Sequence, residues 1–342
     1  MPSLAEANPK EPISVVISTL NRGDQIVPAL KSILANDYPA FDIIVVDQNI
    51  DNTTAIAVAP LLAGNPIKYI RSSVRGLANG HNLAVSHTKN ELIAFTDDDC
   101  VVPVNWLSSI YNAFQQDKKI GLVFGNVVAA DYDKREGYTP DFVRDTALLM
   151  KSAYADLRHG MGIGACFAMR RSAWSKIGGF DTMLGPGSPL GSLEDRDIAI
   201  RVLLANHYVY QTPEVSVLHY GFRPNSKLRN QAFQDWFGFG SSYAKYLKCG
   251  HWKLSYYMLV QMWLGCAVMV ALQVSFKTGR IKRATPVLVF WYGFMRGLFA
   301  SVDRKTSRFT VEKKDLRETK RLVNNPGLAI LSPGNSNPYK AL

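Results

Sequence analysis

An apolar run that ends in three consecutive aspartates constrains this chain more than any other feature. Residues 92–95 (Leu-Ile-Ala-Phe) predict a buried strand, because a short continuous apolar run suits a sheet that is covered on both faces. Asp97, Asp98 and Asp99 follow at its end. Three adjacent carboxylates repel one another and need a cation, hydrogen-bond donors or water nearby. A divalent metal that also binds a diphosphate would meet that need, and the alternative is an acidic, solvated turn.

Strand-like and helix-like segments alternate through the first half of the chain. The predicted strands are 13–18, 41–46, 67–70, 92–95, 121–128 and 165–169, and the predicted helices are 24–34, 79–87, 106–116 and 198–204. This rhythm predicts an α/β fold with a mainly parallel sheet and helices on both faces. Ligands bind such sheets outside the carboxyl ends of the strands, where 19–22, 47–49 and 97–99 all fall. Three polar clusters at one edge predict a nucleotide site.

Two common nucleotide-binding motifs are absent from the sequence. A dinucleotide-binding fold needs Gly-x-Gly-x-x-Gly after its first strand, but residues 18–23 read Ser-Thr-Leu-Asn-Arg-Gly. No Walker sequence Gly-x-x-x-x-Gly-Lys-Ser/Thr occurs either. These absences exclude standard dehydrogenase and P-loop chemistry. A sugar-1-phosphate nucleotidyltransferase also needs a glycine-rich loop after the first strand, so that class is disfavoured too.

The basic charge of the chain lies almost entirely in its last third. Residues 1–240 hold 22 Lys and Arg against 24 Asp and Glu, whereas residues 241–342 hold 17 against 4. Such asymmetry indicates an anionic partner, either nucleic acid or anionic lipid. The cysteines form no CxxC pair and indicate a reducing compartment. The N-terminus has no apolar segment of the signal-peptide kind, so we expect the catalytic part in the cytosol.

The same last third contains two apolar stretches, which favour anionic lipid over nucleic acid as the partner. Residues 254–276 carry no charged side chain, and 284–302 form a second stretch that Pro286 and Arg296 interrupt. Four basic residues lie between them, so spanning helices would place this loop outside, against the positive-inside tendency. We expect helices that lie in the interface of an anionic membrane and no nucleic-acid partner, because no nucleic-acid-reading motif occurs. The alternative is a pair of core helices.

A glycine- and proline-rich loop leads into an acidic helix start in the second half of the chain. Residues 184–191 read Leu-Gly-Pro-Gly-Ser-Pro-Leu-Gly, which is typical of a loop that shapes a pocket or moves. Glu194 and Asp195 follow, with Ser192 as the expected helix cap. Acids in a first turn are also favoured by the helix dipole, so a purely structural role is the alternative. A carboxylate beside a mobile loop can equally serve as a general base.

Together these segments resemble glycosyltransferase family 2, whose members have the GT-A fold, over about residues 12–240. The resemblance rests on seven short motifs in the same order as in the family: residues 17–22, 45–49, 75–82, 97–99, 168–171, 178–181 and 194–197. The last two are especially similar to bacterial enzymes that build surface polysaccharides and glycolipids. The chain then divides into a leader (1–11), the GT-A catalytic domain (12–240), a basic and apolar helical membrane-association region (241–323) and a disordered tail (324–342).

The resemblance implies roles for residues that would bind a nucleoside-diphosphate sugar. Thr19 and Arg22 would line the nucleotide pocket, and Asp97 and Asp98 would bind the ribose. Asp47 would hold its neighbour Gln48, which stands where the family often has an acid that reads the base.

In the family an Arg often stands at the position of His81. Either His81 or Arg75 would therefore contact the base or the diphosphate. The alternative for His81 is an ordinary histidine on a helix face.

The resemblance also implies the catalytic groups. Asp99 would hold Mg²⁺ or Mn²⁺, and His219 matches a histidine that completes the metal site in some relatives, the alternative being a buried histidine at a strand end. Such a metal offsets the charge that develops on the departing diphosphate. Asp195 would deprotonate the acceptor hydroxyl in a direct, inverting displacement, and Glu194 would position the acceptor or the sugar.

We therefore expect a metal-dependent inverting glycosyltransferase on the cytoplasmic face of a bacterial cell membrane. Its acceptor would be a hydroxyl of a lipid-linked glycan or polysaccharide. The alternative is a non-catalytic partner that binds membrane or nucleic acid and carries a decayed transferase domain.

Overall fold

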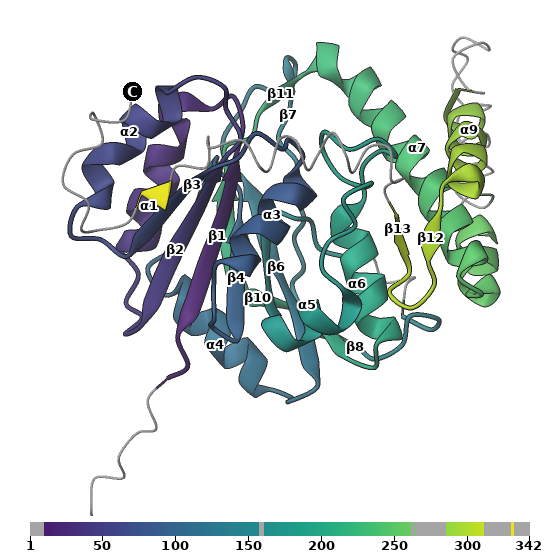
Figure 1. Cartoon of the computed structure of the whole chain (residues 1–342), viewed down its shortest axis with the longest axis horizontal. Coiled ribbons are helices and arrows are strands. Elements are labelled where there is room, and N and C mark those ends of the chain that lie inside the picture. The colour runs from purple at the N-terminus through teal and green to yellow at the C-terminus, as the bar shows by residue number, and fades with distance from the viewer. Residues whose placement is uncertain (1–9, 157–160, 261–262, 264–284, 311–329, 332–342) are drawn as a thin grey trace, which may run out of the picture.

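The apolar runs of the chain become the strands of one large sheet in the computed structural model, which describes residues 10–156, 161–260, 263, 285–310 and 330–331 (Figure 1). The strands are β1 (Ile13–Thr19), β2 (Phe41–Asp47), β3 (Ile67–Arg71), β4 (Leu92–Thr96), β5 (Cys100–Val101), β6 (Ile120–Ala129), β7 (Gly137–Tyr138), β8 (Leu148–Met150), β9 (Cys166–Arg170), β10 (Tyr208–His219), β11 (Arg223–Pro224), β12 (Val302–Asp303), β13 (Arg308–Phe309) and β14 (Ile330–Leu331). The helices are the short turn η1 (Gly23–Gln25), α1 (Ile26–Leu34), α2 (Thr53–Leu62), α3 (Leu77–Ser86), α4 (Trp106–Gln115), α5 (Arg171–Ile177), α6 (Glu194–Leu204), α7 (Asn225–Lys248) and α9 (Thr285–Phe299).

The strands that carry the polar clusters, β2, β1 and β4, are neighbours in the sheet. Neighbouring strands follow the order β14-β3-β2-β1-β4-β9-β6-β10-β5, with β8 also paired to β10. The strands β3, β2, β1 and β4 are parallel, and β10 is parallel to β6, whereas β9 runs antiparallel between β4 and β6. The carboxyl ends of β1, β2 and β4 therefore meet at one edge, as the sequence predicts.

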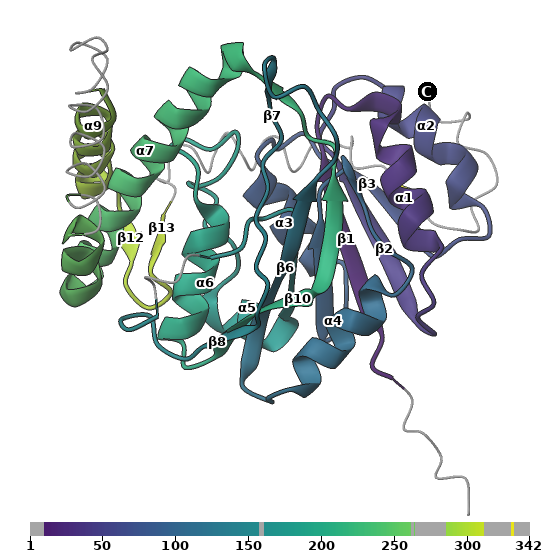
Figure 2. The same ribbon diagram turned by 180° about the vertical axis from the view of Figure 1, so that it is seen from behind.

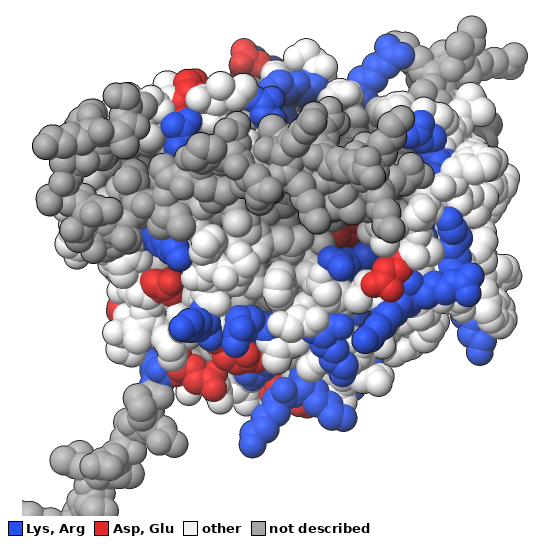
Figure 3. All heavy atoms as spheres, in the orientation of Figure 1, with Lys and Arg blue, Asp and Glu red and all other residues white. Residues whose placement is uncertain are grey.

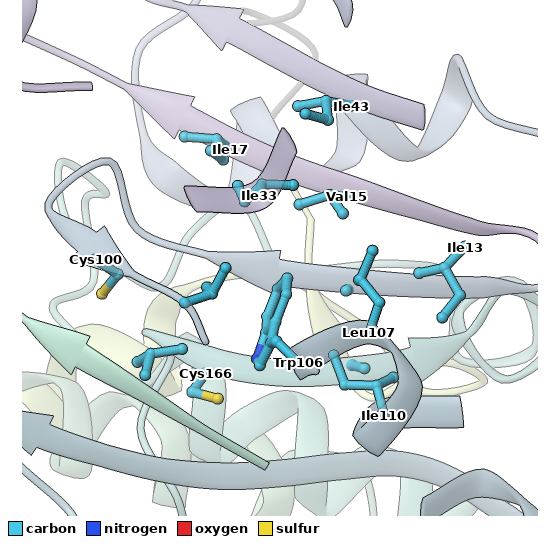
Figure 4. Packing of buried hydrophobic residues seen from close by; sticks show 14 of the residues in the cluster. Ile13, Val15, Ile17, Ile33, Ile43, Cys100, Trp106, Leu107, Ile110 and Cys166 are labelled. Atoms are coloured by element: carbon cyan, nitrogen blue, oxygen red, sulfur yellow. The ribbon is translucent and has the colours of Figure 1, made fainter. Parts of the chain in front are cut away.

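Helices cover both faces of the sheet, which explains why its central strands are mostly apolar (Figure 2). Val15 and Ile17 of β1 pack with α1 and α4 on one face, and Val16 packs with α3 and α6 on the other. Figure 4 shows the first of these layers, where Trp106 and Ile110 lie against the strands. Alternate residues of a strand point to opposite faces, so a doubly covered strand has no solvent-facing position.

Helices of the C-terminal region pack against the α/β part of the chain along α7. Gly240 and Gly293 let α7 and α9 approach at the level of the backbone, since a Cβ on Gly293 would lie 2.1 Å from the Phe237 carbonyl oxygen. Residues 252–260 are helical, and their Leu254 and Met258 pack in an apolar cluster with side chains of α7 and α9. Among the described residues, no helix combines the length and the apolar composition that crossing a bilayer requires. Much of the first predicted apolar stretch, and the basic segment after it, lie outside the described residues.

Two predicted helix caps are wrong. Asp24 lies in η1 and Gln25 precedes α1, with no side-chain cap. Ser192 does not cap α6, because the preceding position is Leu193 and its side chain makes no cap bond. Ile330–Leu331, within the predicted disordered tail, pairs with β3 as a short strand, and the rest of that tail lies outside the described residues.

Candidate active site

The polar clusters at the ends of β1, β2 and β4 lie together and bond to one another. The Gln48 amide donates to the Thr19 carbonyl oxygen over 3.0 Å, and the Asn21 amide donates to the Asn49 side chain over 2.5 Å. The Thr19 hydroxyl donates to Asp98 Oδ2 over 2.6 Å. The predicted convergence of these clusters at one edge is therefore observed.

Arg22 supplies the nearest positive charge to the aspartates that follow β4. Its Nη2 lies 2.6 Å from Asp99 Oδ2, and its Nε lies 3.4 Å from Asp98 Oδ1. Burial nevertheless raises the pKa of Asp98 to about 7, because the Thr19 hydrogen bond and Arg22 offset only part of the desolvation. Burial, followed by the charge of Asp99, raises the pKa of Asp97 to about 6. The cluster thus resists carrying three negative charges.

Asp99 differs from its two neighbours because it faces His219. Burial alone raises the pKa of Asp99, but contact with His219 and the charge of Arg22 outweigh it, so the pKa falls below its usual value. His219 Nε2 lies 3.3 Å from Asp99 Oδ1, and His219 Nδ1 lies 2.8 Å from the Pro140 carbonyl oxygen. The second contact fixes the ring and directs Nε2 at the carboxylate. Antiparallel pairing of β5 with β10 sets His219 opposite Cys100 and so beside Asp99.

A glycine keeps the space in front of this pair open. A Cβ on Gly221 would lie 2.3 Å from His219 Nε2 and 3.0 Å from Asp99 Oδ2. Asp99 Oδ1 is buried and faces His219 Nε2 across 3.3 Å. An oxygen and an imidazole nitrogen facing a cradle of this kind fit Mn²⁺ or Mg²⁺. Sequence reasoning missed Gly221, because only the folded chain brings it against two side chains.

Cys100 lies close enough to Asp99 and His219 to complete a three-residue group. Its side chain, however, is packed in the apolar layer between the sheet and the helices (Figure 4). Burial, followed by the charges of Asp97 and Asp99, raises the pKa of the thiol well above its usual value. A protonated thiol is a poor metal ligand, so Asp99 and His219 are the candidate ligands here.

Asp47 and Gln48 are buried and hold the loops around the pocket. Asp47 accepts hydrogen bonds from the Asn49 amide at 2.8 Å and from the Tyr69 hydroxyl. The Gln48 side-chain amide donates to the carbonyl oxygens of Val74 and Gly76 at 2.8 and 3.0 Å. Gln48 thereby fixes the strand-to-helix turn before α3, a role that its position at the end of β2 does not reveal.

Arg75 and His81 flank this turn but occupy opposite environments. Arg75 is exposed. His81 is only 2% exposed and lies among Phe95, Phe167 and Phe180, with ring centroids 5.1 to 6.2 Å away. Burial lowers its pKa to about 3, so the ring is neutral. The side chain of His81 is therefore part of the aromatic core. Of the two alternatives for a diphosphate contact, His81 and Arg75, only Arg75 is exposed to solvent.

Glu194 and Asp195 begin α6 and form the second acidic group of the site. Asp195 Oδ2 accepts a hydrogen bond from the Gly164 amide over 3.1 Å, and Oδ1 accepts one from Arg196 over 2.6 Å. Glu194 is buried beneath the 184–191 loop, since a Cβ on Gly185 would lie 3.0 Å from Glu194 Oε2. Burial, followed by the charge of Asp195, raises the pKa of Glu194 well above its usual value.

Glu194, beside Asp195, lies within electrostatic reach of the aspartates that follow β4. Burial raises the pKa of Asp195, although its two backbone hydrogen bonds and Arg196 lower it in part. The charge of Asp97 also contributes to the raised pKa of Glu194, which places the two acidic groups within electrostatic reach. The site therefore combines a candidate metal pair with a candidate base of raised proton affinity.

Comparison with known proteins agrees with the fold and with the first half of the chain. Residues 14–178 match the family model described as Glycosyl transferase family 2. Glycosyltransferase GlyG of Streptococcus pneumoniae serotype 4 is 31% identical over 129 residues, which are 37% of this chain and 42% of that protein. Poly-beta-1,6-N-acetyl-D-glucosamine synthase of Staphylococcus epidermidis is 26% identical over 117 residues, 34% of this chain and 28% of that protein. The chain thus spans less than half the length of these two relatives.

Two solved structures share the architecture. The mannosyltransferase PcManGT from Pyrobaculum calidifontis, in complex with GDP-Man and Mn²⁺, has a TM-score of 0.52 at 16% identity and covers 84% of this chain and 87% of its own. Residues 1-349 of S. aureus TarS give a TM-score of 0.51 at 13% identity, over 84% of this chain and 71% of that one. The expected GT-A fold is confirmed.

The raised pKa of Glu194 predicts how the stability of the ligand-free protein changes with pH. The folded state binds the Glu194 proton more tightly than the unfolded chain does. The resulting stabilisation is present below the ordinary pKa of a glutamate and is lost as the pH rises through the raised value. Glu194→Gln has no proton to lose at this position, so the variant does not lose this stabilisation as the pH rises. The difference in melting temperature between Glu194→Gln and the wild type should therefore shift in favour of the variant between pH 5 and pH 8. Thermal unfolding of both proteins at pH 5 and at pH 8 measures this shift. A difference in melting temperature that is the same at the two pH values would contradict the prediction.

Proposed function

Because the chain belongs to glycosyl transferase family 2 through residues 14–178, we propose that it moves a sugar from a nucleoside-diphosphate sugar to an acceptor hydroxyl. The acceptor is a glycan or a glycolipid, and the reaction depends on a divalent metal and inverts the anomeric centre. The relatives named above support the reaction class. The observation that carries the proposal is the Asp99–His219 pair facing the Gly221 cradle, beside the polar ends of β1 and β2.

Asp99 and His219 are the proposed ligands of Mn²⁺ or Mg²⁺. When bound, the metal supplies positive charge to the diphosphate leaving group. The solved mannosyltransferase holds GDP-Man together with Mn²⁺, which supports a metal of this kind. Arg22, whose guanidinium lies 2.6 Å from Asp99, adds a second positive charge at the same place.

The proposed donor pocket is the edge where β1, β2 and β4 end. Thr19 and Asp98, joined by a 2.6 Å hydrogen bond, present polar groups to the nucleoside, and Asp97 lies beside them. Exposed Arg75 is available to the diphosphate. Gln48 acts indirectly, because its amide holds the turn that carries Arg75. TarS has been solved with UDP-GlcNAc at a TM-score of 0.50 and 17% identity, over 61% of this chain and 58% of that one, which supports a nucleotide sugar as the donor class.

Asp195 is the proposed general base. It accepts the proton of the acceptor hydroxyl while that oxygen bonds to the anomeric carbon and the bond to the diphosphate breaks. Two backbone amides hold the Asp195 carboxylate in one orientation, and its raised pKa makes it a stronger base. Glu194, buried beside it, positions the acceptor or the donor sugar.

We also propose that the C-terminal helices lie against an anionic membrane on the cytoplasmic side. An exposed apolar stripe at helical spacing on α9 supports this: Leu288, Tyr292, Met295 and Phe299. The helix after α7 exposes Trp252 and Tyr256 in the same way. Figure 3 shows Lys and Arg gathered on the side of the molecule that carries β12 and β13, which favours anionic headgroups.

Nucleotide binding tests the donor class. We expect one nucleoside diphosphate from a panel of UDP, GDP, TDP, CDP and ADP to raise the melting temperature when Mn²⁺ or Mg²⁺ is present. The rise should disappear in Asp99→Asn, because the metal loses a charged ligand, and persist in the control Asp145→Asn, which changes an exposed aspartate. A folded wild type that responds to no nucleotide would contradict the donor proposal.

Gly221→Ala tests the metal cradle without removing a ligand. Its methyl group would sit 2.3 Å from His219 Nε2, so affinity for Mn²⁺ should fall by about tenfold or more. Titration of Mn²⁺ into the nucleotide complex measures the change. The control Gly64→Ala adds a methyl group with nothing within 4 Å and should leave Mn²⁺ affinity unchanged. Unaltered affinity in Gly221→Ala would place the metal elsewhere.

Sedimentation with lipid vesicles tests the membrane face. The wild type should pellet with vesicles of phosphatidylcholine and phosphatidylserine, and less with phosphatidylcholine alone. Tyr292→Ser with Phe299→Ser should weaken binding by about tenfold or more, because two exposed aromatic side chains that would enter the membrane interface are lost. Ile56→Ser, on an equally exposed part of α2, is the control. Equal pelleting of the double variant would rule out this face.

A further inference from the structure

Four charged side chains form a buried network behind α6, away from the candidate donor pocket. Asp181, Asp197, Arg201 and Lys245 are each at most 2% exposed. Lys245 Nζ of α7 donates to Asp181 Oδ2 over 2.7 Å and also to Asp197 Oδ1. Arg201 Nε donates to Asp197 Oδ2 over 2.7 Å. Two carboxylates thus meet two cations in a site closed to water.

The network joins segments that are far apart in the sequence. The Tyr246 hydroxyl donates to Asp197 over 2.7 Å, and the Phe309 amide of β13 donates to Asp181 over 2.9 Å. Arg201 also donates to the Gly179 carbonyl oxygen over 2.7 Å. Burial raises the pKa of Asp197, but the charges of Arg201 and Lys245 outweigh it and bring the pKa below its usual value. Arg201 and Lys245 therefore both stabilise the charged form of Asp197, which lies on α6.

That side chain belongs to the same helical turn as the candidate base. Successive residues of an α-helix are about 100° apart, so Asp197 points about 200° away from Asp195. Asp195 reaches the Gly164 amide on the pocket side, and Asp197 reaches Lys245 on the α7 side. A rotation of α6 about its axis that moved one carboxylate would move the other.

Helix α6 begins after a residue with a strained backbone conformation. Leu193, the residue that precedes the helix, has a left-handed φ of +88° and makes no side-chain cap bond. A leucine in this conformation is strained and persists only where its surroundings hold it. The backbone of α7 supplies part of that hold, since the Ser192 amide donates to the Gln234 carbonyl oxygen over 3.2 Å. Lys245, three helical turns further along α7, supplies a second attachment through Asp197.

We propose that Lys245 is a positioning residue, which fixes the rotation of α6 and thereby the place of the Glu194 and Asp195 carboxylates in the pocket. The helix α7 then acts as a brace that carries the C-terminal helices on one side and sets the catalytic turn on the other. This inference rests on the proposed function for its effect on rate, but its effect on the position of α6 is independent of any substrate.

Hydrogen exchange measures that position without an activity assay. In Lys245→Met the amides of 193–198, and the Gly164 amide that bonds to Asp195, should exchange faster, whereas β1 to β4 should be unchanged. The control Lys248→Met removes another α7 lysine, which donates to the Leu298 carbonyl oxygen over 2.7 Å and does not touch α6. It should leave the exchange of 193–198 unaltered. Unaltered exchange in Lys245→Met as well would overturn the proposal.

Kinetics separate positioning from simple charge balance. With the UDP- or GDP-sugar that the wild type consumes and a bacterial lipid extract as acceptor source, kcat for diphosphate release should fall about a hundredfold in Lys245→Met, while KM for the donor stays within about twofold. Adding Asp181→Asn restores a neutral network and should restore stability but not kcat. Recovery of kcat in this double variant would overturn the proposal in favour of charge balance alone.

Two further outcomes remain distinguishable. If Lys245→Met does not fold, the double variant and Lys245→Arg take its place, and normal exchange at 193–198 in the folded double variant overturns the proposal. If the wild type consumes no nucleotide sugar, the proposed function fails, and the exchange measurement still supports or overturns the role of Lys245 in holding α6.

Discussion

The burial, in part or in full, of five carboxylates sets the main physical constraint on this structure. Asp97, Asp98 and Asp99 end one strand, and Glu194 and Asp195 begin a helix that faces the same pocket. Burial raises the pKa of four of these five groups and leaves only Asp99, beside Arg22 and His219, with a lowered one. A pocket of this kind is built for a cation that arrives with an anionic ligand.

The fold assembles these groups from three directions. Parallel pairing brings the ends of β1, β2 and β4 to one edge and so sets Thr19 and Arg22 against Asp98 and Asp99. Pairing of β10 with β5 brings in His219. The start of α6 depends instead on contacts with α7, because its own N-terminus lacks a cap. Groups that repel one another are thus held by elements whose stability comes from apolar packing elsewhere.

The sequence predicted the features that local pattern determines. Strands covered on both faces appear in the sequence as continuous apolar runs. In a parallel sheet the topology brings the polar ends of such strands together. The edge that carries Thr19, Asp47 and Asp98 could therefore be predicted from the sequence. The role of His81 could not be predicted in this way, because a histidine in a helix can face either solvent or the core, and three phenylalanines from separate elements decide which.

Features set by tertiary contact escaped sequence reasoning for the same reason. Gly221 matters only because His219 and Asp99 converge on it, and no local pattern announces that. The sequence around Lys245 indicates a surface residue of a basic region. In the structure Lys245 is completely buried, and its partner Asp197 is 48 positions away in the sequence. The capping pattern at Ser192 was outweighed by the bond from its amide to α7. In each case a distant segment decided the outcome.

A crystal structure with Mn²⁺ and the nucleoside diphosphate that binds, recorded so that manganese gives an anomalous signal, would locate the metal. We predict one strong peak within coordination distance of both Asp99 and His219, in front of Gly221, with the diphosphate beside Arg22. A manganese peak elsewhere, or a diphosphate bound at this edge with no metal between Asp99 and His219, would contradict it.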